Sequence, residues 1–158
     1  MKCLIVYCSE YKSNTEKIAR IFAEKIDCEL ISIRNVKDIS DINIENYNLI
    51  GFGSGVYRES ISPKLVKLVD KLNLTGKNVF VFSTSGAGMK YYNNSLIKLL
   101  DKKAAINRGS FACKGSFNAR EFTDKKIFEF MGKLSEGHPN DRDLKMAEKF
   151  FTSVLDSL

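Results

Sequence analysis

The sequence has little proline and glycine, no tryptophan and no long hydrophobic run. Only two of its 158 residues are Pro and ten are Gly, which excludes a Pro-rich or Gly-rich linker between domains. No apolar stretch approaches the roughly 20 residues that are needed to cross a bilayer. The N-terminus also lacks the pattern of a secretory signal peptide. We therefore expect a cytoplasmic protein that does not associate with a membrane.

Cysteine and histidine are too scattered to predict a metal site. The four cysteines, Cys3, Cys8, Cys28 and Cys113, form no C-x-x-C pair, and three of them lie in apolar runs. This pattern favours small core residues over metal ligands or a disulfide framework. The single histidine, His138, lies in the turn sequence G-H-P-N without other ligands at a suitable spacing.

The remaining composition is that of a globular protein. Apolar residues make up 44% and charged residues 28% of the chain, so residues 1–158 are expected to form a single domain with one sizeable core. The net charge is +6, but the 25 Lys and Arg are mixed along the chain with 19 Asp and Glu. Because such mixing is typical of a solvated surface, we expect no nucleic-acid binding, and a monomer or weak dimer.

Strand-length apolar runs alternate with amphipathic helical patterns. The runs cover residues 2–8, 28–33, 48–53, 78–83 and 105–113, and the helical patterns cover residues 14–26, 62–72, 93–103, 123–133 and 140–157. Ser62 before Pro63, and Asn140, are typical residues at the start of a helix. Residues 34–46 are polar and irregular, which predicts a loop. The alternation predicts an α/β fold, a doubly wound five-stranded parallel sheet with helices on both faces.

In such a sheet, ligands bind beyond the carboxyl ends of the strands. The loop after the first strand contains Ser9, Ser13, Asn14 and Thr15 at the start of a helix. Hydroxyl and amide side chains, free backbone N–H groups and the positive end of a helix dipole together suit a phosphate group, and Lys12 would add positive potential. A simpler interpretation, in which one of these residues only caps the helix, remains open.

Other phosphate-binding classes do not match this loop. It contains neither G-x-x-x-x-G-K-[ST] nor G-x-G-x-x-G. A cysteine phosphatase would use Cys8 but would need an arginine near the end of the loop, which is absent. The third strand also ends in S-G-V-Y rather than in the acidic residues that a magnesium-dependent phospho-acceptor domain requires.

Two further loops are predicted at the same edge of the sheet. Residues 51–60 contain Gly55, which permits backbone conformations that other residues resist, and Tyr57, which supplies a flat amphipathic ring. Residues 82–92 end a strand in small polar residues and glycines, which lets backbone approach a flat ligand closely. The three loops together predict a phosphate cradle and two walls around a planar ring.

These segments resemble the flavodoxin family. The resemblance is carried by K-C-L-I-V-Y-C-S-E-Y-K-S-N-T-E-K-I-A, by G-F-G-S-G-V-Y-R, by F-S-T-S-G, and by F-A-C-K-G-S-F with the later G-H-P-N-D-R-D-L-K-M-A-E-K-F. It spans essentially the whole chain and implies the strand order 2-1-3-4-5 and bound FMN. The implied cofactor-binding residues are Ser9, Tyr11, Lys12, Ser13, Asn14, Thr15, Ser54, Gly55, Val56, Tyr57, Arg58, Ser83, Thr84, Ser85, Gly86, Ala87 and Gly88. Residues 115–119 are expected to close the site.

The chain departs from the family pattern in three ways. Ser13 replaces the glycine that usually precedes Asn-Thr, and the absence of Trp leaves ring stacking to Tyr57 or, in second place, to Tyr91, Tyr92 or Phe117. The basic charge differs from that of acidic flavodoxins. The resemblance implies a low-potential electron carrier between redox partner proteins, without catalytic residues of its own. An FMN reductase that uses NAD(P)H, and a flavin-free interaction domain, remain open as alternatives.

Overall fold

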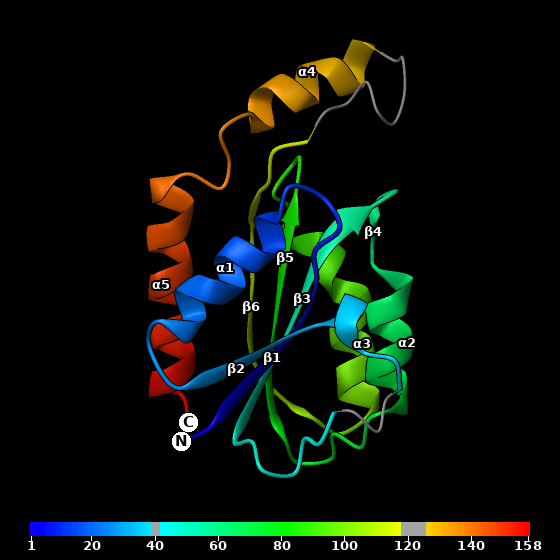
Figure 1. Ribbon diagram of the computed structural model, residues 1–158, viewed down its shortest axis with the longest axis vertical. Helices are drawn as coiled ribbons and strands as arrows, with labels where there is room; N and C mark the ends of the chain where they lie inside the picture. The colour runs from blue at the N-terminus through cyan, green and yellow to red at the C-terminus, as the bar shows by residue number, and fades with distance from the viewer. Residues whose placement is uncertain (39–41, 118–125) are drawn as a thin grey trace.

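A six-stranded sheet forms the centre of the computed structural model, which describes residues 1–38, 42–117 and 126–158. Five parallel strands lie in the spatial order β2-β1-β3-β5-β6 (Figure 1). They are β1 (Cys3–Cys8), β2 (Cys28–Ser32), β3 (Leu49–Tyr57), β5 (Asn78–Ser85) and β6 (Ile106–Lys114). The short β4 (Ser60–Ile61), which the sequence did not predict, pairs antiparallel with β3. Counted without β4, the order is 2-1-3-4-5, so the expected fold class is confirmed.

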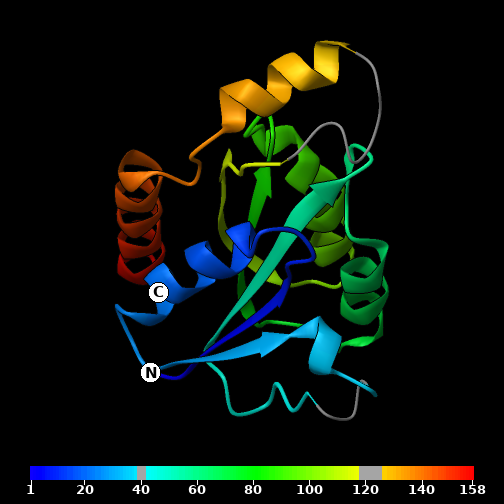
Figure 2. The ribbon, with the colours of Figure 1, turned by 45° about the horizontal axis from the view of Figure 1, so that its top comes forward.

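Helices cover both faces of the sheet. Helices α1 (Asn14–Ala23) and α5 (Asp141–Asp156) contribute to the core on one face, and α2 (Pro63–Lys71) and α3 (Asn94–Lys102) to the core on the other. Helix α4 (Lys126–Ser135) lies apart from these layers, beyond the carboxyl ends of the strands (Figures 1 and 2). No helix in the described part of the chain has the length and apolar character needed to cross a bilayer.

The chain departs from simple strand–helix alternation at two places, and the predicted ranges contain both: a loop over residues 34–46 and two helical segments after the last strand. Between β2 and β3, the described residues contain only the 3₁₀ turn η1 (Ile33–Asn35). The apolar residues of this crossover are too irregularly spaced to form the continuous stripe of an amphipathic helix. Its isoleucines Ile33, Ile42 and Ile44 are nevertheless buried in the core on this face of the sheet. After β6, two helices follow one another, and residues 123–125 of the expected fourth helical segment lie outside the described residues.

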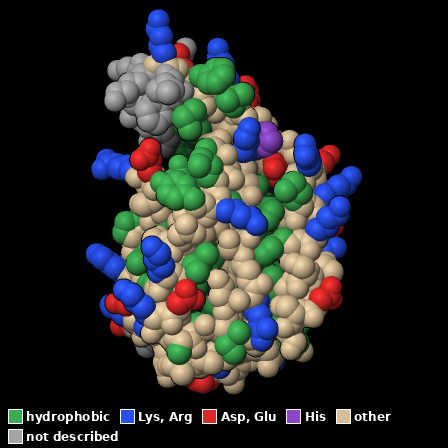
Figure 3. All heavy atoms as spheres, turned by 180° about the vertical axis from the view of Figure 1, so that it is seen from behind, with side chains coloured by type: hydrophobic (Ala, Val, Ile, Leu, Met, Phe, Trp, Pro, Cys, Tyr) green, Lys and Arg blue, Asp and Glu red, His purple; other side chains and the backbone are tan. Residues whose placement is uncertain are grey.

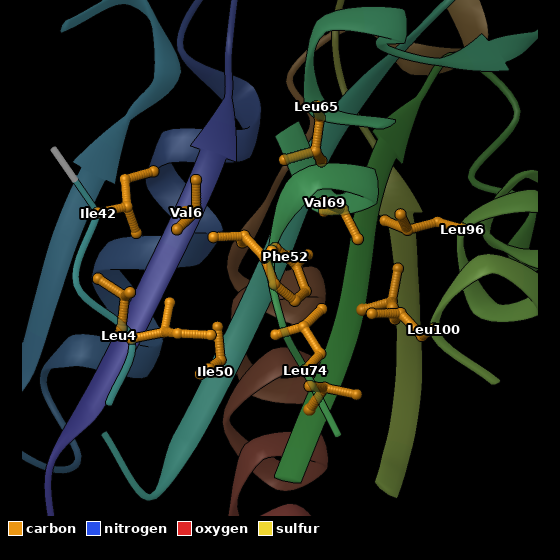
Figure 4. Close-up of a cluster of buried hydrophobic side chains, with 14 of the residues drawn as sticks. Leu4, Val6, Ile42, Ile50, Phe52, Leu65, Val69, Leu74, Leu96 and Leu100 are labelled. Atoms are coloured by element: carbon orange, nitrogen blue, oxygen red, sulfur yellow. The ribbon is translucent and has the colours of Figure 1, made fainter. Parts of the chain in front are cut away.

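The core under α2 and α3 is mainly aliphatic. Side chains from β1, β3 and the two helices point into a common layer (Figure 4). Its labelled members are Leu4, Val6, Ile42, Ile50, Phe52, Leu65, Val69, Leu74, Leu96 and Leu100. Full burial of each such side chain contributes about 1.5–3 kcal/mol relative to exposure, so this layer fixes α2 and α3 on the sheet.

The core under α1 and α5 is aromatic. The Phe22 ring of α1 stacks on Phe151 of α5 at a centroid distance of 4.9 Å and meets Phe82 of β5 edge-on at 5.1 Å. The Phe82 ring lies across β3 at Gly53, where an added Cβ would be only 2.1 Å from Phe82 Cζ. Gly53 therefore provides the space that lets these rings fill the layer.

The edge strand β6 is irregular near its middle. Val79 pairs with Asn107 but Val81 pairs with Ser110, so β6 has one more residue than β5 over this stretch. Gly109 lies at the bulge with a φ of 142°, which side chains rarely allow. The strand therefore bends at this point.

Candidate functional site

The carboxyl ends of β1, β3 and β5 bring the three predicted loops to one edge of the sheet, because these strands are neighbours. The first loop joins β1 to α1, the second follows β3 and the third follows β5. Helix α1 begins at this edge, so the positive end of its dipole lies there. We call this region the carboxyl edge.

The first loop contains hydrogen-bonding groups that are not used within the described chain. Lys12 and Ser13 have φ values of 47° and 53°, in the left-handed region. Ser13 precedes the first helical residue, but its side chain makes no capping hydrogen bond, so the simple cap interpretation does not account for it. Ser9 Oγ and Asn14 Oδ1 are buried and have no hydrogen-bond partner among the described residues. Such groups are costly to bury unless something binds them.

Side-chain hydrogen bonds connect the first loop to its neighbours. Thr15 Oγ1 and Thr84 Oγ1 lie 2.9 Å apart, joining the start of α1 to the end of β5. Asn14 Nδ2 donates to Ser116 O at 2.9 Å, just after β6. The Ser116 N–H donates in turn to His138 O at 2.8 Å. Residues far apart in the sequence therefore hold this loop in place.

Tyr57 links the second loop to the first. Its hydroxyl accepts a hydrogen bond from the Glu10 N–H at 2.8 Å, and its ring lies over Gly55, where an added Cβ would be 2.6 Å from the Tyr57 hydroxyl oxygen. Burial raises the pKa of Tyr57 above the usual tyrosine value, although the Glu10 N–H and Arg34 act in the opposite direction. Tyr57 is thus a neutral, half-buried ring at the carboxyl edge.

The predicted second loop is largely a strand, which corrects the expectation from the sequence. Strand β3 continues through Ser54, Gly55, Val56 and Tyr57, because Gly55 pairs with Thr84 and Val56 pairs with Ile61 of the unpredicted β4. Only the Arg58–Glu59 turn remains outside the strands, with both side chains exposed.

Ser54 has an internal role in this hairpin. Its side chain is fully buried. Ser54 Oγ donates to Gly55 O at 2.5 Å and accepts from the Ser62 N–H at 3.0 Å. The hydroxyl therefore connects β3 to the start of α2 and is not available at the surface of the carboxyl edge.

The third loop is held close to the end of β6. Ser85 Oγ accepts from the Gly88 N–H at 2.8 Å, and Ser85 O accepts from the Gly115 N–H at 2.9 Å. Ser83 Oγ is buried without a hydrogen-bond partner among the described residues. Ser83, Thr84 and Ser85 form the end of β5, so only Gly86, Ala87 and Gly88 of the predicted residues lie in the loop itself.

Phe117 lies directly on the third loop. A Cβ added to Gly86 would be 2.2 Å from Phe117 Cε1, so the aromatic ring occupies the space above this glycine. Residues 115–117 of the predicted closing segment therefore do reach the carboxyl edge, whereas residues 118 and 119 lie outside the described residues. Tyr91 and Tyr92 lie in the 3₁₀ turn η3 (Lys90–Asn93), with ring centroids 4.5 Å apart.

The cysteines near the carboxyl edge are packed thiols. Cys8 and Cys113 are buried, and burial raises the pKa of both thiols. Neither environment favours the thiolate that a nucleophile requires. Cys3 is also buried and Cys28 is half-buried, so the prediction of core cysteines is confirmed for three of the four. Among the described residues, no group of three or more His, Cys, Asp or Glu is placed to hold a metal ion.

Sequence reasoning missed several residues at this edge. Glu10 pairs with Lys64 of α2, with 3.4 Å between Oε1 and Nζ. Arg34 of η1 lies close enough to lower the pKa of Tyr57 and of Cys8 against the effect of burial. Their contacts join segments far apart along the chain, so no local spacing in the sequence indicates them.

Comparison with known proteins agrees with this architecture. Residues 4–142 match the flavodoxin domain family. An uncharacterized protein of Methanocaldococcus jannaschii is 38% identical over 157 residues, which cover 98% of this chain and 99% of the relative. Oxidised flavodoxin 1 from Bacillus cereus superposes with a TM-score of 0.69 at 20% identity, covering 100% of this chain and 99% of the other.

A further solved structure is a flavoprotein from Lactobacillus acidophilus in complex with FMN. It superposes with a TM-score of 0.55 at 25% identity, and the similarity covers 69% of this chain and 91% of that protein. The family match extends over nearly the whole chain, and the strand order is the one that the resemblance implied. The chain belongs to the flavodoxin family.

Proposed function

We propose that this protein binds FMN at the carboxyl edge and transfers electrons between partner proteins. FMN would supply the redox chemistry, and the chain would bind it, orient it and limit the access of water. The proposal rests on the buried hydroxyl of Ser9, which has no hydrogen-bond partner in the described part of the chain and lies near the start of α1, where Ser13 makes no side-chain capping hydrogen bond.

The first loop has the chemistry expected of a phosphate cradle. Ser9 Oγ can donate a hydrogen bond to a phosphate oxygen without giving up another partner. In the Thr15–Thr84 pair one hydroxyl donates to the other, so the accepting hydroxyl still has a proton to donate. Asn14 Nδ2 is used by Ser116 O, which leaves Asn14 Oδ1 as an acceptor suited to a sugar-alcohol hydroxyl rather than to phosphate. Such a mixed set fits a ribityl phosphate chain.

The second and third loops supply the surfaces for a flat ring. Tyr57 offers an aromatic ring that stays neutral at physiological pH. The third loop, which follows the neighbouring strand β5, offers backbone at Gly86–Gly88, close to Phe117. The cations Lys12 and Arg58 are exposed near these loops and would favour an anionic ligand. Two of the predicted residues, Ser54 and Ser85, hold the loops in place through internal hydrogen bonds.

The proposal is tested by titrating the purified protein with FMN and with riboflavin. We expect tight binding of FMN, seen as quenched flavin fluorescence, and weaker binding of riboflavin, which lacks the phosphate. Ser9→Ala should weaken FMN binding by about 0.5–1.5 kcal/mol or more, the contribution of one hydrogen bond. It should leave riboflavin binding and the free energy of unfolding nearly unchanged. Ser95→Ala, an exposed serine of α3, is the matched control.

Equal affinity for FMN and riboflavin, or no binding of either, would contradict the proposed cradle. Electron transfer is tested separately on the flavin-loaded protein. Steady-state oxidation of NAD(P)H with a quinone acceptor would indicate a reductase, whereas a carrier should show none without a partner reductase. A protein that stays colourless after incubation with FMN would support the flavin-free alternative.

A further inference from the structure

Helices α4 and α5 present a surface that combines cations with exposed apolar side chains. It consists of Phe130 and Leu134 of α4 and of Arg142, Lys145, Met146 and Lys149 of α5, and we call it the α4–α5 surface. The side chains of Phe130, Leu134 and Met146 are 62%, 50% and 49% exposed. Figure 3 shows the molecule from behind, with Lys and Arg side chains spread over both flanks and several hydrophobic side chains near the end that carries the grey residues.

The charges on α5 are segregated by hydrogen bonds and ion pairs. Arg142, Lys145 and Lys149 recur at helical spacing and line one side of the helix with Met146, around a shallow hollow of about 480 Å³. The two carboxylates between Arg142 and Lys149, those of Asp143 and Glu148, are engaged by residues outside the helix. Asp143 Oδ2 contacts His138 Nδ1 at 2.5 Å, and Glu148 Oε2 pairs with Lys25 Nζ at 3.5 Å. Between Arg142 and Lys149 the mixed sequence therefore folds into a basic stripe, which begins directly after the exposed Asp141.

Helix α4, which lies beyond the N-terminal end of α5 (Figure 1), carries two exposed apolar side chains. Phe130 and Leu134 are four residues apart, so they lie on the same side of the helix. Among the described side chains, none from α4 belongs to either hydrophobic core or packs against one. Lys114 Nζ donates to Leu134 O at 3.5 Å, which keeps the end of α4 near the end of β6.

The surface is connected to the carboxyl edge. Asn14 of the first loop donates to Ser116 O, and the Ser116 N–H donates to His138 O, directly before α5. A partner bound to α4 and α5 would therefore lie next to the proposed cofactor site. Redox partners need such closeness, and their interfaces are commonly small, with a few apolar residues among charged ones.

We propose that the α4–α5 surface binds an acidic electron-transfer protein, an inference that rests on the proposed function. The partner's carboxylates would face Arg142, Lys145 and Lys149, and its apolar residues would contact Phe130, Leu134 and Met146. Met, Phe and Arg are enriched in the cores of protein interfaces. A nucleic acid would be matched by the cations but not by three exposed apolar side chains, which favours a protein.

The test uses a small acidic iron–sulfur protein of the bacterial ferredoxin type as the probe. A carbodiimide couples lysine amines to carboxylates only where the two proteins are in contact. We expect cross-links at Lys145 and Lys149, located by mass spectrometry, both with and without bound FMN. The affinity, measured by calorimetry, should fall as salt is raised, because screening weakens the attraction between exposed charges.

Lys145→Glu with Lys149→Glu should lower the affinity for the probe by about tenfold or more at low salt. The matched control is Lys98→Glu with Lys102→Glu, two exposed lysines of α3 on the opposite face of the sheet with the same change in charge. If the first variant unfolds, Lys145→Gln with Lys149→Gln makes the same comparison. Met146→Ser should also weaken binding without altering the net charge.

The inference is overturned if the α3 variant weakens binding as much as the α5 variant. It is also overturned if cross-links form elsewhere, or if phosphatidylglycerol vesicles or duplex DNA bind the α5 stripe more tightly than the iron–sulfur protein does. A protein that cross-links as expected but binds no FMN would refute only the proposed function. A protein that binds FMN but gives no cross-links would refute only this inference.

Discussion

At the scale of single residues, the polar atoms at the carboxyl edge divide into two groups. Ser54 and Ser85 make internal hydrogen bonds that position backbone, whereas Ser9 and Ser83 have buried hydroxyls without a partner among the described residues. The sequence alone marks all four as equivalent small polar residues. Their difference arises from which neighbours the fold brings within hydrogen-bond distance.

Tyr57 should make the free energy of unfolding decrease as the pH rises in the alkaline range. Burial raises the pKa of its hydroxyl in the folded state, so above the ordinary tyrosine pKa of about 10 the unfolded chain binds fewer protons than the folded one. The contribution of Tyr57 is thus fully present below pH about 10 and is lost as the pH rises further. Tyr57→Phe should reduce the decline in the free energy of unfolding between pH about 9 and 11, measured by urea denaturation.

The exposed Tyr91 provides the control for this measurement. Tyr91→Phe should leave the alkaline decline close to that of the unaltered protein. An unchanged decline in Tyr57→Phe would show that the hydroxyl is not buried against the Glu10 N–H as described.

At the scale of elements, the sequence predicted the long strands and most helices well. Apolar runs give β1, β2, β5 and β6 nearly at their observed positions, because both faces of the sheet are covered. The sequence did not predict the carboxyl end of β3, because Ser54 and Gly55 lack the apolar character of a strand. This part of β3 is extended because it pairs with β4 and β5. The contacts between the loops could not be predicted from local sequence either, because residues such as Thr15 and Thr84 are 69 positions apart in the chain.

Substitutions in the turn between β3 and β4 should increase the stability of the protein. Arg58 and Glu59 have φ values of 47° and 63°, a left-handed conformation that costs residues with a Cβ about 1 kcal/mol or more. Two-residue hairpin turns with positive φ at both positions favour Asn-Gly. Arg58→Asn with Glu59→Gly should therefore raise the free energy of unfolding by about 1 kcal/mol, measured by chemical denaturation.

Arg58→Ala with Glu59→Ala removes the same side chains but keeps the unfavourable backbone conformation, so it should not stabilise the hairpin. If the alanine variant were as stable as the Asn-Gly variant, repulsion or solvation of the charged side chains would explain the gain, and not the backbone. The same Asn-Gly variant shows whether Arg58 contributes to FMN affinity.

At the scale of the whole molecule, one sheet separates two cores of different composition. The aromatic core depends on Phe22, which is fully buried and contacts rings from both α5 and β5. Phe22→Ala should lower the free energy of unfolding by about 3–5 kcal/mol, the cost of the lost burial and the remaining cavity. Phe130→Ala, which truncates a side chain that is 62% exposed, should change it little. Similar losses in both variants would contradict the packing of α1 against α5.

The charge distribution is also a property of the whole molecule. Lys and Arg are mixed with Asp and Glu along the chain, which predicts an evenly solvated surface. The fold instead turns Asp143 and Glu148 away from the cations of α5. A one-dimensional pattern could not indicate this separation, because it depends on the partners His138 and Lys25.

The bulge in β6 has a consequence for how copies of this protein meet. An edge strand exposes a row of backbone donors and acceptors that can template pairing with another strand. The extra residue opposite β5 and the bend at Gly109 interrupt that row near its middle, so a second copy could not extend the sheet in continuous register. The irregularity therefore disfavours pairing with a second copy at the β6 edge, which is one of the two edges of the parallel sheet.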